Sequence, residues 1–198
     1  MSQGIPYTIE PRPDTGLTNG RIGLWLFLAS ELMLFAGLYA GYLLLRTGTP
    51  DWPSGRELLQ VEMAGLNTVV LLAASWTMWR AVRAIGRDDY YACRGHLLSS
   101  FLLGAVFVGV KLTEYRMKWA DGLVPATDNF YGTYYVLTGV HALHVLGGLL
   151  ATLWLLGPGG RLFKTEPRHF VLRVGYLATY WYFVDSVWLV IFPSLYLV

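Results

Sequence analysis

Five long apolar stretches, separated by short polar segments, dominate the pattern of this 198-residue chain. A bilayer core of about 30 Å needs about 20 residues of helix, and each stretch is long enough to span it. Within the hydrocarbon, backbone polar groups must be satisfied inside each segment, and the alternation typical of barrel strands is absent. We expect helices over about residues 22–45, 63–85, 97–117, 130–156 and 170–192. The sequence therefore predicts an all-α, polytopic bundle of five transmembrane helices.

The polar segments divide the chain into a tail at residues 1–20 and one predicted transmembrane domain at residues 21–198. The tail is interrupted by proline and lacks the basic start and apolar core of a cleavable signal, so the first helix is expected to remain in the mature protein. Short loops rich in Lys and Arg stay on the cytoplasmic side. Most basic residues lie in the tail and in the second and fourth connections. We expect a cytoplasmic N-terminus and a C-terminus on the periplasmic, outer side.

Composition supports a membrane protein and excludes several other classes. Hydrophobic residues make up 55% of the chain and charged residues only 14%, which is far from a soluble globule. The net charge of +2 gives no argument for a nucleic-acid partner. The single cysteine, Cys93, cannot form an internal disulfide, a Cys-x-x-Cys haem attachment or a thiolate copper centre.

Ionisable side chains within the apolar stretches are the candidate functional residues, because each costs about 2.5 to 3.5 kcal/mol at a helix centre. Counting about 1.5 Å per residue places Glu31 close to mid-membrane. The same count places Glu114, His141 and Asp185 in the outer half, where we expect a buried polar cluster with Glu31 apart from it. The full set is Glu31, Lys111, Glu114, His141, His144 and Asp185.

Two interpretations of the motif "GVHALHV" are open. His141 and His144 are three residues apart and can share a helix face, so a carboxylate could complete a metal site with them. Alternatively, the histidines hydrogen-bond to carboxylates and neighbouring helices. The second interpretation is favoured, because a membrane haem usually takes one histidine from each of two helices and no second partner exists.

The carboxylates of the first and third helices also have two interpretations each. Lys111, Glu114 and Lys118 form a charge ladder near the outer boundary, for which snorkelling and self-neutralisation is the favoured explanation. Glu31 has no opposite charge within its own helix. It is either a protonated carboxyl bonded to a neighbouring helix or a proton-handling group, and the residues alone favour neither.

Five stretches follow one another along the chain in a distinctive order: "GLWLFLASELMLFAGLYAGYLL", "LNTVVLLAASWTMWRA", "EY", "YGTYYVLTGVHALHVLGG" and "YWYFVDSVWLVIFPSLYL". Together they resemble subunit III of the haem-copper respiratory oxidases, in the family's order. The resemblance runs from about residue 20 to residue 198. The motif "GVHALHV" followed by "FVDSVW" is specific.

The resemblance implies an accessory subunit of a proton-pumping oxidase that reduces oxygen to water. In that family the subunit holds no haem or copper, packs against the catalytic subunit I, binds phospholipid and is thought to support proton uptake. No residue here is therefore expected to be catalytic, cofactor-binding or metal-binding. By position, Glu31 matches the family's buried carboxylate, Glu114 its helix-end glutamate, and His141, His144 and Asp185 its polar cluster.

The implied partners are subunits I and II, a small subunit IV, phospholipids and a respiratory supercomplex, in a bacterial inner membrane. This chain differs from longer relatives, which have two additional N-terminal helices. It also has Tyr182 where the family commonly has histidine in "WHFVD", so we expect different hydrogen bonding between the fifth and fourth helices.

Other functions stay open on the sequence. The electron donor is either cytochrome c or quinol. The chain could instead be an accessory subunit of a nitric oxide reductase, with the same fold. A stand-alone transporter or an intramembrane metal-binding protein could use the histidine and carboxylate cluster instead.

Overall fold

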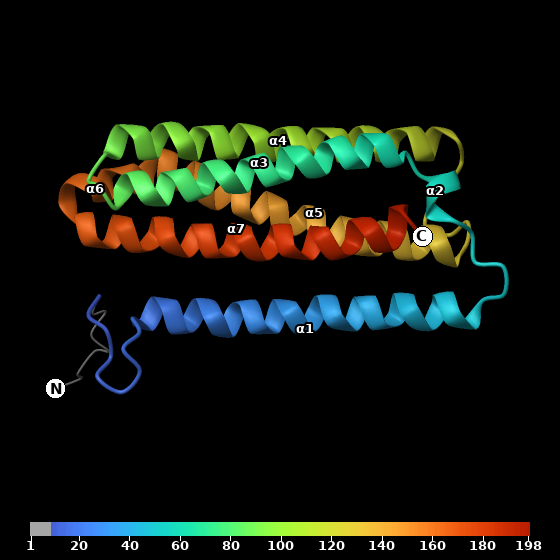
Figure 1. The fold of residues 1–198 in the computed structure, drawn as a ribbon, viewed down its shortest axis with the longest axis horizontal. Helices are drawn as coiled ribbons and strands as arrows, with labels where there is room; N and C mark the ends of the chain where they lie inside the picture. Colours follow the sequence, from blue (N-terminus) through green and yellow to red (C-terminus); the bar gives the residue numbers. More distant parts are fainter. Residues whose placement is uncertain (1–8) are drawn as a thin grey trace.

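The structure, a computed structural model, describes residues 9–198. Five helices in this part of the chain are long and apolar enough to cross a membrane, which confirms the prediction of five helical spans (Figure 1). They are α1 (Asn19–Gly48), α3 (Val61–Ile85), α4 (Tyr90–Ala120), α5 (Asn129–Leu156) and α7 (Pro167–Tyr196). Three short helices lie in the connections: α2 (Gly55–Leu58), η1 (Pro158–Arg161) and α6 (Leu162–Thr165).

Most of the long helices begin before their apolar stretch, because a polar residue caps the first turn. The Thr18 side chain accepts from the backbone N–H of Arg21, and Asp89 and Asp128 cap α4 and α5 in the same way. Such caps satisfy backbone donors that a helix start leaves without a partner. These helices therefore begin outside their apolar stretches.

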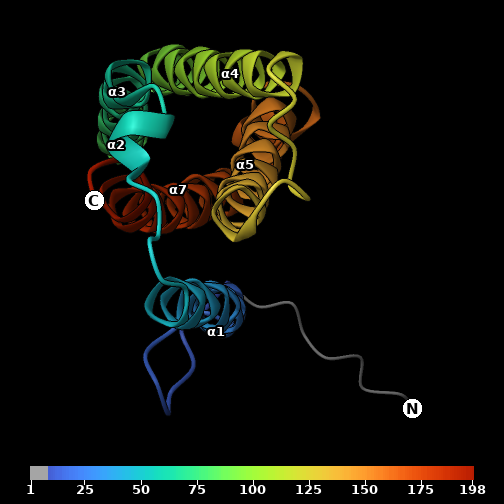
Figure 2. The same cartoon turned by 90° about the vertical axis from the view of Figure 1, so that its right-hand side faces the viewer.

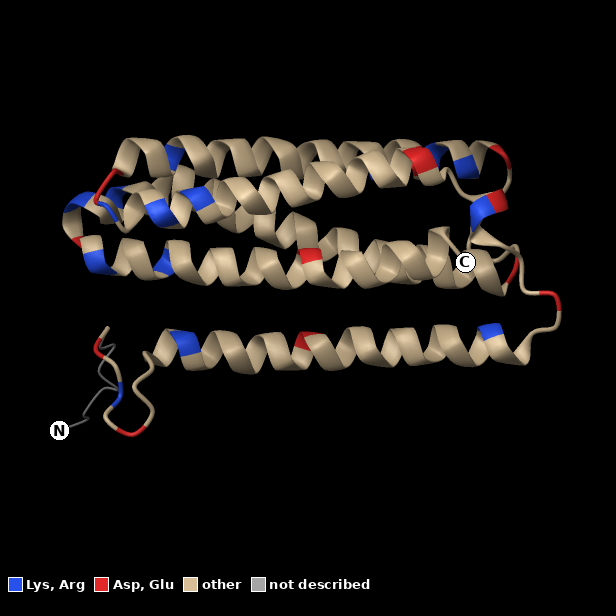
Figure 3. Cartoon of the chain, in the orientation of Figure 1, with Lys and Arg blue, Asp and Glu red and all other residues tan. Residues whose placement is uncertain are grey.

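Four helices form the body of the molecule, and α1 lies outside it. Viewed along the helices, α3, α4, α5 and α7 enclose a common core, and α1 runs beside the face made by α5 and α7 (Figure 2). Because successive helices are antiparallel, the connections collect at two ends, named here the α2 end and the α6 end (Figure 1). Acidic and basic residues lie mainly near these two ends (Figure 3).

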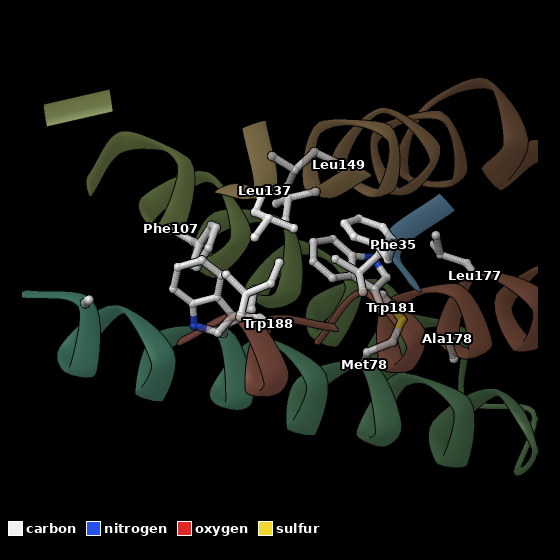
Figure 4. Packing of buried hydrophobic residues seen from close by; sticks show 14 of the residues in the cluster. Phe35, Met78, Phe107, Leu137, Leu149, Leu177, Ala178, Trp181 and Trp188 are labelled. Atoms are coloured by element: carbon white, nitrogen blue, oxygen red, sulfur yellow. The ribbon is translucent and has the colours of Figure 1, made fainter. Parts of the chain in front are cut away.

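Large aromatic side chains fill the core of the four-helix body. Trp181 and Trp188 of α7 are fully buried, and Trp188 packs against Phe107 at a right angle (Figure 4). Each indole N–H is satisfied inside the core, by Thr152 Oγ1 at 3.2 Å and Thr68 Oγ1 at 2.9 Å. These bonds fix α7 against α5 and α3 where its apolar packing alone would allow sliding.

Gly104 of α4 makes room for the buried Trp181 ring. A Cβ atom at Gly104 of α4 would lie 2.8 Å from the Trp181 ring and 2.9 Å from Leu149. Both distances are well inside van der Waals contact, so only glycine allows α4 this close to the indole.

Polar contacts attach α1 to the body at both of its ends. The Thr18 and Tyr176 hydroxyls are 2.6 Å apart at the α6 end. At the α2 end, Tyr42 donates to the Ser194 carbonyl at 2.6 Å, and the Tyr39 hydroxyl lies 2.8 Å from the Ser194 hydroxyl. Most other α1 side chains face outward, since only Leu28, Phe35 and Tyr42 of this helix are buried.

Candidate functional site

An acid and an imidazole meet between α1 and the four-helix body. The Oε2 atom of Glu31 lies 2.8 Å from Nε2 of His144 on α5. The two side chains are 18% and 14% exposed in this chain, so the pair is shielded but not enclosed. Glu31 is expected from sequence to lie apart from a cluster of Glu114, His141 and Asp185; its partner is His144, which is not one of those three.

The hydrogen bonds of His144 limit how protons are distributed in this pair. His144 Nδ1 lies 2.8 Å from the Val140 carbonyl, which can only accept, so Nδ1 carries a proton. One further proton then lies between Nε2 and Glu31. The pair is either an imidazolium with a carboxylate or a neutral imidazole with a carboxylic acid, and one proton transfer along the 2.8 Å contact interconverts them.

Aromatic side chains surround the Glu31–His144 pair. The Phe35 ring lies 5.0 Å from the imidazole, centroid to centroid, and the Tyr180 hydroxyl donates to the His144 carbonyl at 2.8 Å. Tyr180 also stacks at 6.2 Å on Phe27 of α1. The imidazole therefore has an aromatic ring on one side, and a hydrogen bond from α7 fixes the backbone of His144.

The second ion pair is buried near the α2 end. Lys111 Nζ lies 2.8 Å from Glu114 Oε2, and their side chains are only 2% and 1% exposed. Lys111 also donates to the hydroxyls of Tyr134, at 3.3 Å, and Tyr196, at 2.6 Å. Both tyrosines donate in turn to Glu114 Oε1 at 2.8 Å. The charges thus neutralise one another, and α4 is joined to both α5 and α7.

This second pair is closed off within the four-helix body. All three ammonium donors of Lys111 have acceptors, and Glu114 accepts three hydrogen bonds. Four aromatic rings lie 5.0 to 5.6 Å from Nζ, which adds cation–π stabilisation. The predicted ladder does not continue to Lys118, whose ammonium instead donates to the Leu58 carbonyl of α2.

His141 and Asp185 make separate contacts rather than one cluster with Glu114, which corrects the expectation from sequence. His141 Nε2 lies 3.2 Å from the Val184 carbonyl, and the ring is buried between Phe107 and Trp188. Asp185 accepts from the Ser75 hydroxyl of α3. His141 Nδ1 and Asp185 Oδ1 have no hydrogen-bond partner within residues 9–198.

Tyr182 lies on the outer side of α7, where it is 38% exposed. Hydrogen bonds between α7 and α5 come instead from Tyr180, Trp181 and the Val184 carbonyl. Tyr180, Ser75, Tyr134 and Tyr196 could not be singled out from sequence, because an aromatic residue or serine in an apolar helix is ordinarily a packing residue.

A signal for the Glu31–His144 contact was present in the helix ends. Glu31 lies twelve residues after the first residue of α1, and His144 twelve residues before the last residue of α5. Both helix ends are at the α6 end, so the two side chains have the same depth. Measuring the depth of every polar side chain from the same membrane surface would identify Glu31 and His144 as neighbours in depth.

Among the described residues 9–198, no group of three or more His, Cys, Asp or Glu could hold a metal ion. The Lys111–Glu114 pair is enclosed and internally paired, whereas the Glu31–His144 pair is partly exposed and can exchange a proton along its contact. The geometry therefore points to Glu31 and His144 as the candidate site.

The family model and two relatives that match this chain all carry the name of the same oxidase subunit. The family model for cytochrome c oxidase subunit III matches residues 13–198. Cytochrome c oxidase subunit 3 of Bacillus sp. (strain PS3) is 34% identical over 96% of this chain and 93% of its own length. Cytochrome bo(3) ubiquinol oxidase subunit 3 of Pseudomonas aeruginosa is 31% identical over 90% of this chain and 85% of its own length.

A third relative has a different chain organisation. The heme-copper oxidase subunit I+III of Aeropyrum pernix is 33% identical over 90% of this chain, which corresponds to 22% of that longer protein. The matching region is thus one part of a chain whose name covers two subunits.

Proposed function

The chain belongs to the cytochrome c oxidase subunit III family, and we propose that it is an accessory subunit of a proton-pumping terminal oxidase, with haem and copper held by its partners. Relatives named for cytochrome c oxidase and for ubiquinol oxidase match it to similar extents, so both electron donors fit the proposal.

The fused relative carries the proposal for the partner. In Aeropyrum pernix, subunit I and subunit III are named as one chain. A covalent connection keeps the two parts in the same membrane and at a fixed ratio. We propose that this chain packs against a separate subunit I, with subunit II in the same complex, in a bacterial inner membrane.

The Glu31–His144 pair supports a role in proton supply. It is the ion pair at membrane depth that is not fully enclosed, and one proton moves within it without the loss of a hydrogen bond. We propose that the pair buffers protons beside the uptake path of the partner, while the closed Lys111–Glu114 pair holds the helices together. Glu31 and His144 are supporting residues here, since the reacting oxygen lies in another subunit.

A cavity adjoins the seam between α1 and the four-helix body. It has a volume of about 570 Å³ and lies between α1 and the α5–α7 face, with Leu24, Trp154 and Arg173 among its lining residues. An apolar cavity with one guanidinium fits a phospholipid, whose phosphate would meet Arg173. We propose that lipid here fills the space between α1 and the body. We also propose a cytoplasmic α6 end, since basic residues collect there.

Purification of the complex from its native membrane tests the assignment. We expect this chain to copurify with a catalytic subunit that contains haem and copper, measured by metal analysis and mass spectrometry. A partner with non-haem iron in place of copper would indicate a nitric oxide reductase instead. Stoichiometric metal in the isolated chain would contradict an accessory role.

Substitution of Glu31 tests the proton role separately. The Glu31→Gln side chain can still donate an N–H to His144 Nε2, so the contact is kept while its exchangeable acid is lost. We expect normal assembly with a decline in oxidase activity over many turnovers. Glu62→Gln, in the exposed first turn of α3, is the control. Unchanged sustained activity in Glu31→Gln would contradict the role.

A further inference from the structure

A basic cavity lies at the α6 end of the α3–α4 hairpin, away from α1 and the Glu31–His144 pair. Its volume is about 440 Å³, and its lining includes three guanidinium groups and one imidazole. The four basic residues come from both helices and from the turn between them: Arg80, Arg83, Arg87 and His96.

The three arginines of this cavity have no carboxylate partner. Within residues 9–198, none of them forms an ion pair. Asp89 also lines the cavity, but one of its oxygens caps α4 by accepting from the Ala92 N–H at 2.9 Å. Three positive charges thus face a single acid that is already engaged, and the cavity has a net positive charge.

One arginine is held in position by an aromatic ring. The Arg83 guanidinium lies over the Trp79 ring, 4.6 Å from its centroid. Trp79 is 45% exposed at the end of the apolar part of α3, the depth at which indole rings meet lipid headgroups. This contact orders a cation at the boundary between hydrocarbon and water.

A line of at least partly exposed side chains on each helix, together called the hairpin seam, leads from this cavity toward the second half of the hairpin's length. Helical spacing of three or four residues connects Ala84 and Arg80 with Thr77, Ala73 and Val70 on α3. The same spacing on α4 connects the lining residues with a second, apolar cavity of about 440 Å³. The α4 members are Ala92, His96, Ser99, Leu103, Val106 and Val110.

The length of the seam matches one leaflet. Half of a bilayer core is about 15 Å, or about ten residues of helix. Ten residues separate Arg80 from Val70 and His96 from Val106, and both Val70 and Val106 line the second cavity. A molecule with its anionic group among the arginines would therefore place an acyl chain in the apolar cavity.

We propose that this seam is a binding site for an anionic phospholipid, with the headgroup phosphate among Arg80, Arg83 and Arg87 and one acyl chain between α3 and α4. Basic cavities between transmembrane helices suit such headgroups. The site is separate from the cavity beside α1, and it depends on the chain spanning a membrane rather than on its role in an oxidase.

Native mass spectrometry of the detergent-purified complex tests the headgroup site. The complex is delipidated and then mixed with phosphatidylglycerol, with phosphatidylcholine or with inorganic phosphate. We expect Arg80→Gln/Arg87→Gln to bind phosphatidylglycerol about thirtyfold more weakly than the unchanged chain, because each basic residue near an anionic lipid contributes roughly a fivefold factor. Phosphatidylcholine binding should change much less.

The matched control is Lys164→Gln/Arg168→Gln, which removes two positive charges at the same end but outside the cavity. Equal loss of phosphatidylglycerol in both double variants, or no loss in either, would overturn the proposal. So would binding of inorganic phosphate as tight as that of phosphatidylglycerol, lost in Arg80→Gln/Arg87→Gln and kept in the control, since the ligand would then be the free anion. Oxidase activity is not part of this readout, so failure here is distinct from failure of the proposed function.

A second variant tests the acyl-chain part of the site. Gly109 lines the apolar cavity, and a Cβ atom there would meet no neighbour within 4 Å. Gly109→Leu therefore fills the cavity from an open position without disturbing the helix contact. We expect weaker binding of long-chain phosphatidylglycerol and unchanged binding of a six-carbon analogue. Equal binding of the long-chain lipid to both forms would remove the acyl-chain assignment.

Discussion

The two ion pairs at membrane depth differ in how completely the chain satisfies them. Lys111 and Glu114 have five hydrogen bonds between them and two tyrosines, and every bond lies inside the four-helix body. Glu31 and His144 share one contact across the seam to α1. The first pair joins α4 to α5 and α7 inside the body. The second joins α1 to α5 through a single contact along which a proton can move.

This difference separates structure from function among residues of the same chemical type. Burying a charge costs several kcal/mol unless it is paired and bonded, so a fully bonded pair is explained by stability alone. A pair between two packed units, with one contact and partial exposure, can also exchange a proton. Proton-handling residues are therefore better sought at helix seams than in the best-connected network.

Removal of one charge from the closed pair should have the largest effect. We expect Lys111→Met to destabilise the chain by about 3 to 5 kcal/mol, because Glu114 is then buried without its counter-charge. Unfolding by SDS in mixed micelles measures the change. The double variant Lys111→Met/Glu114→Leu should recover most of the loss. A double variant as unstable as the single one would show that the charge is not the cause.

Loss of one tyrosine hydroxyl should have the next largest effect. The Tyr196 hydroxyl accepts from Lys111 and donates to Glu114, so Tyr196→Phe removes two hydrogen bonds to charged groups. We expect a loss of about 2 kcal/mol in the same SDS unfolding measurement. Tyr91→Phe is the control, since Tyr91 is 86% exposed. Equal stability of the two variants would mean that the network tolerates an open position.

Changes at the seam should cost less. Glu31→Leu leaves His144 Nε2 without its partner, and we expect a loss of about 1 kcal/mol, within the range measured for hydrogen bonds between membrane helices. A double-mutant cycle with His144→Leu gives the coupling between the two side chains. A coupling above about 3 kcal/mol would place this pair in the same class as Lys111–Glu114 and remove the contrast.

The smallest effect is expected at Tyr182, the residue that replaces a common histidine. Its ring is 38% exposed, and no hydrogen bond from its hydroxyl is found in residues 9–198. We expect Tyr182→Phe to change stability by less than about 0.5 kcal/mol. Tyr180→Phe, which loses the bond to the His144 carbonyl, is the informative comparison in the same assay. A larger loss at Tyr182 than at Tyr180 would contradict this assignment.

The helices could be predicted from sequence because the apolar stretches have a length set by the bilayer. The five spans follow from that requirement alone. The ends could not, since Thr18, Asp89 and Asp128 extend the helices by capping them outside the apolar run.

The candidate residues were also identifiable, because an ionisable group in an apolar helix is costly wherever it points. Their partners were not. Spacing within α5 suggests that His141 and His144 act together, yet one faces Val184 and the other Glu31. Which helix lies against each face is a property of the packed bundle, and Gly104 with Trp181 shows how such packing depends on single side chains.

The position of α1 has a consequence for biosynthesis. Glu31 precedes His144 by 113 residues, and the contacts at the two ends of α1 join residues separated by 158 and 155 positions. At about 5 to 20 residues per second, the ribosome makes His144 roughly 6 to 20 s after Glu31. During that interval α1 lacks all of these partners. Docking of α1 through these contacts therefore has to wait until α5 and α7 have been made.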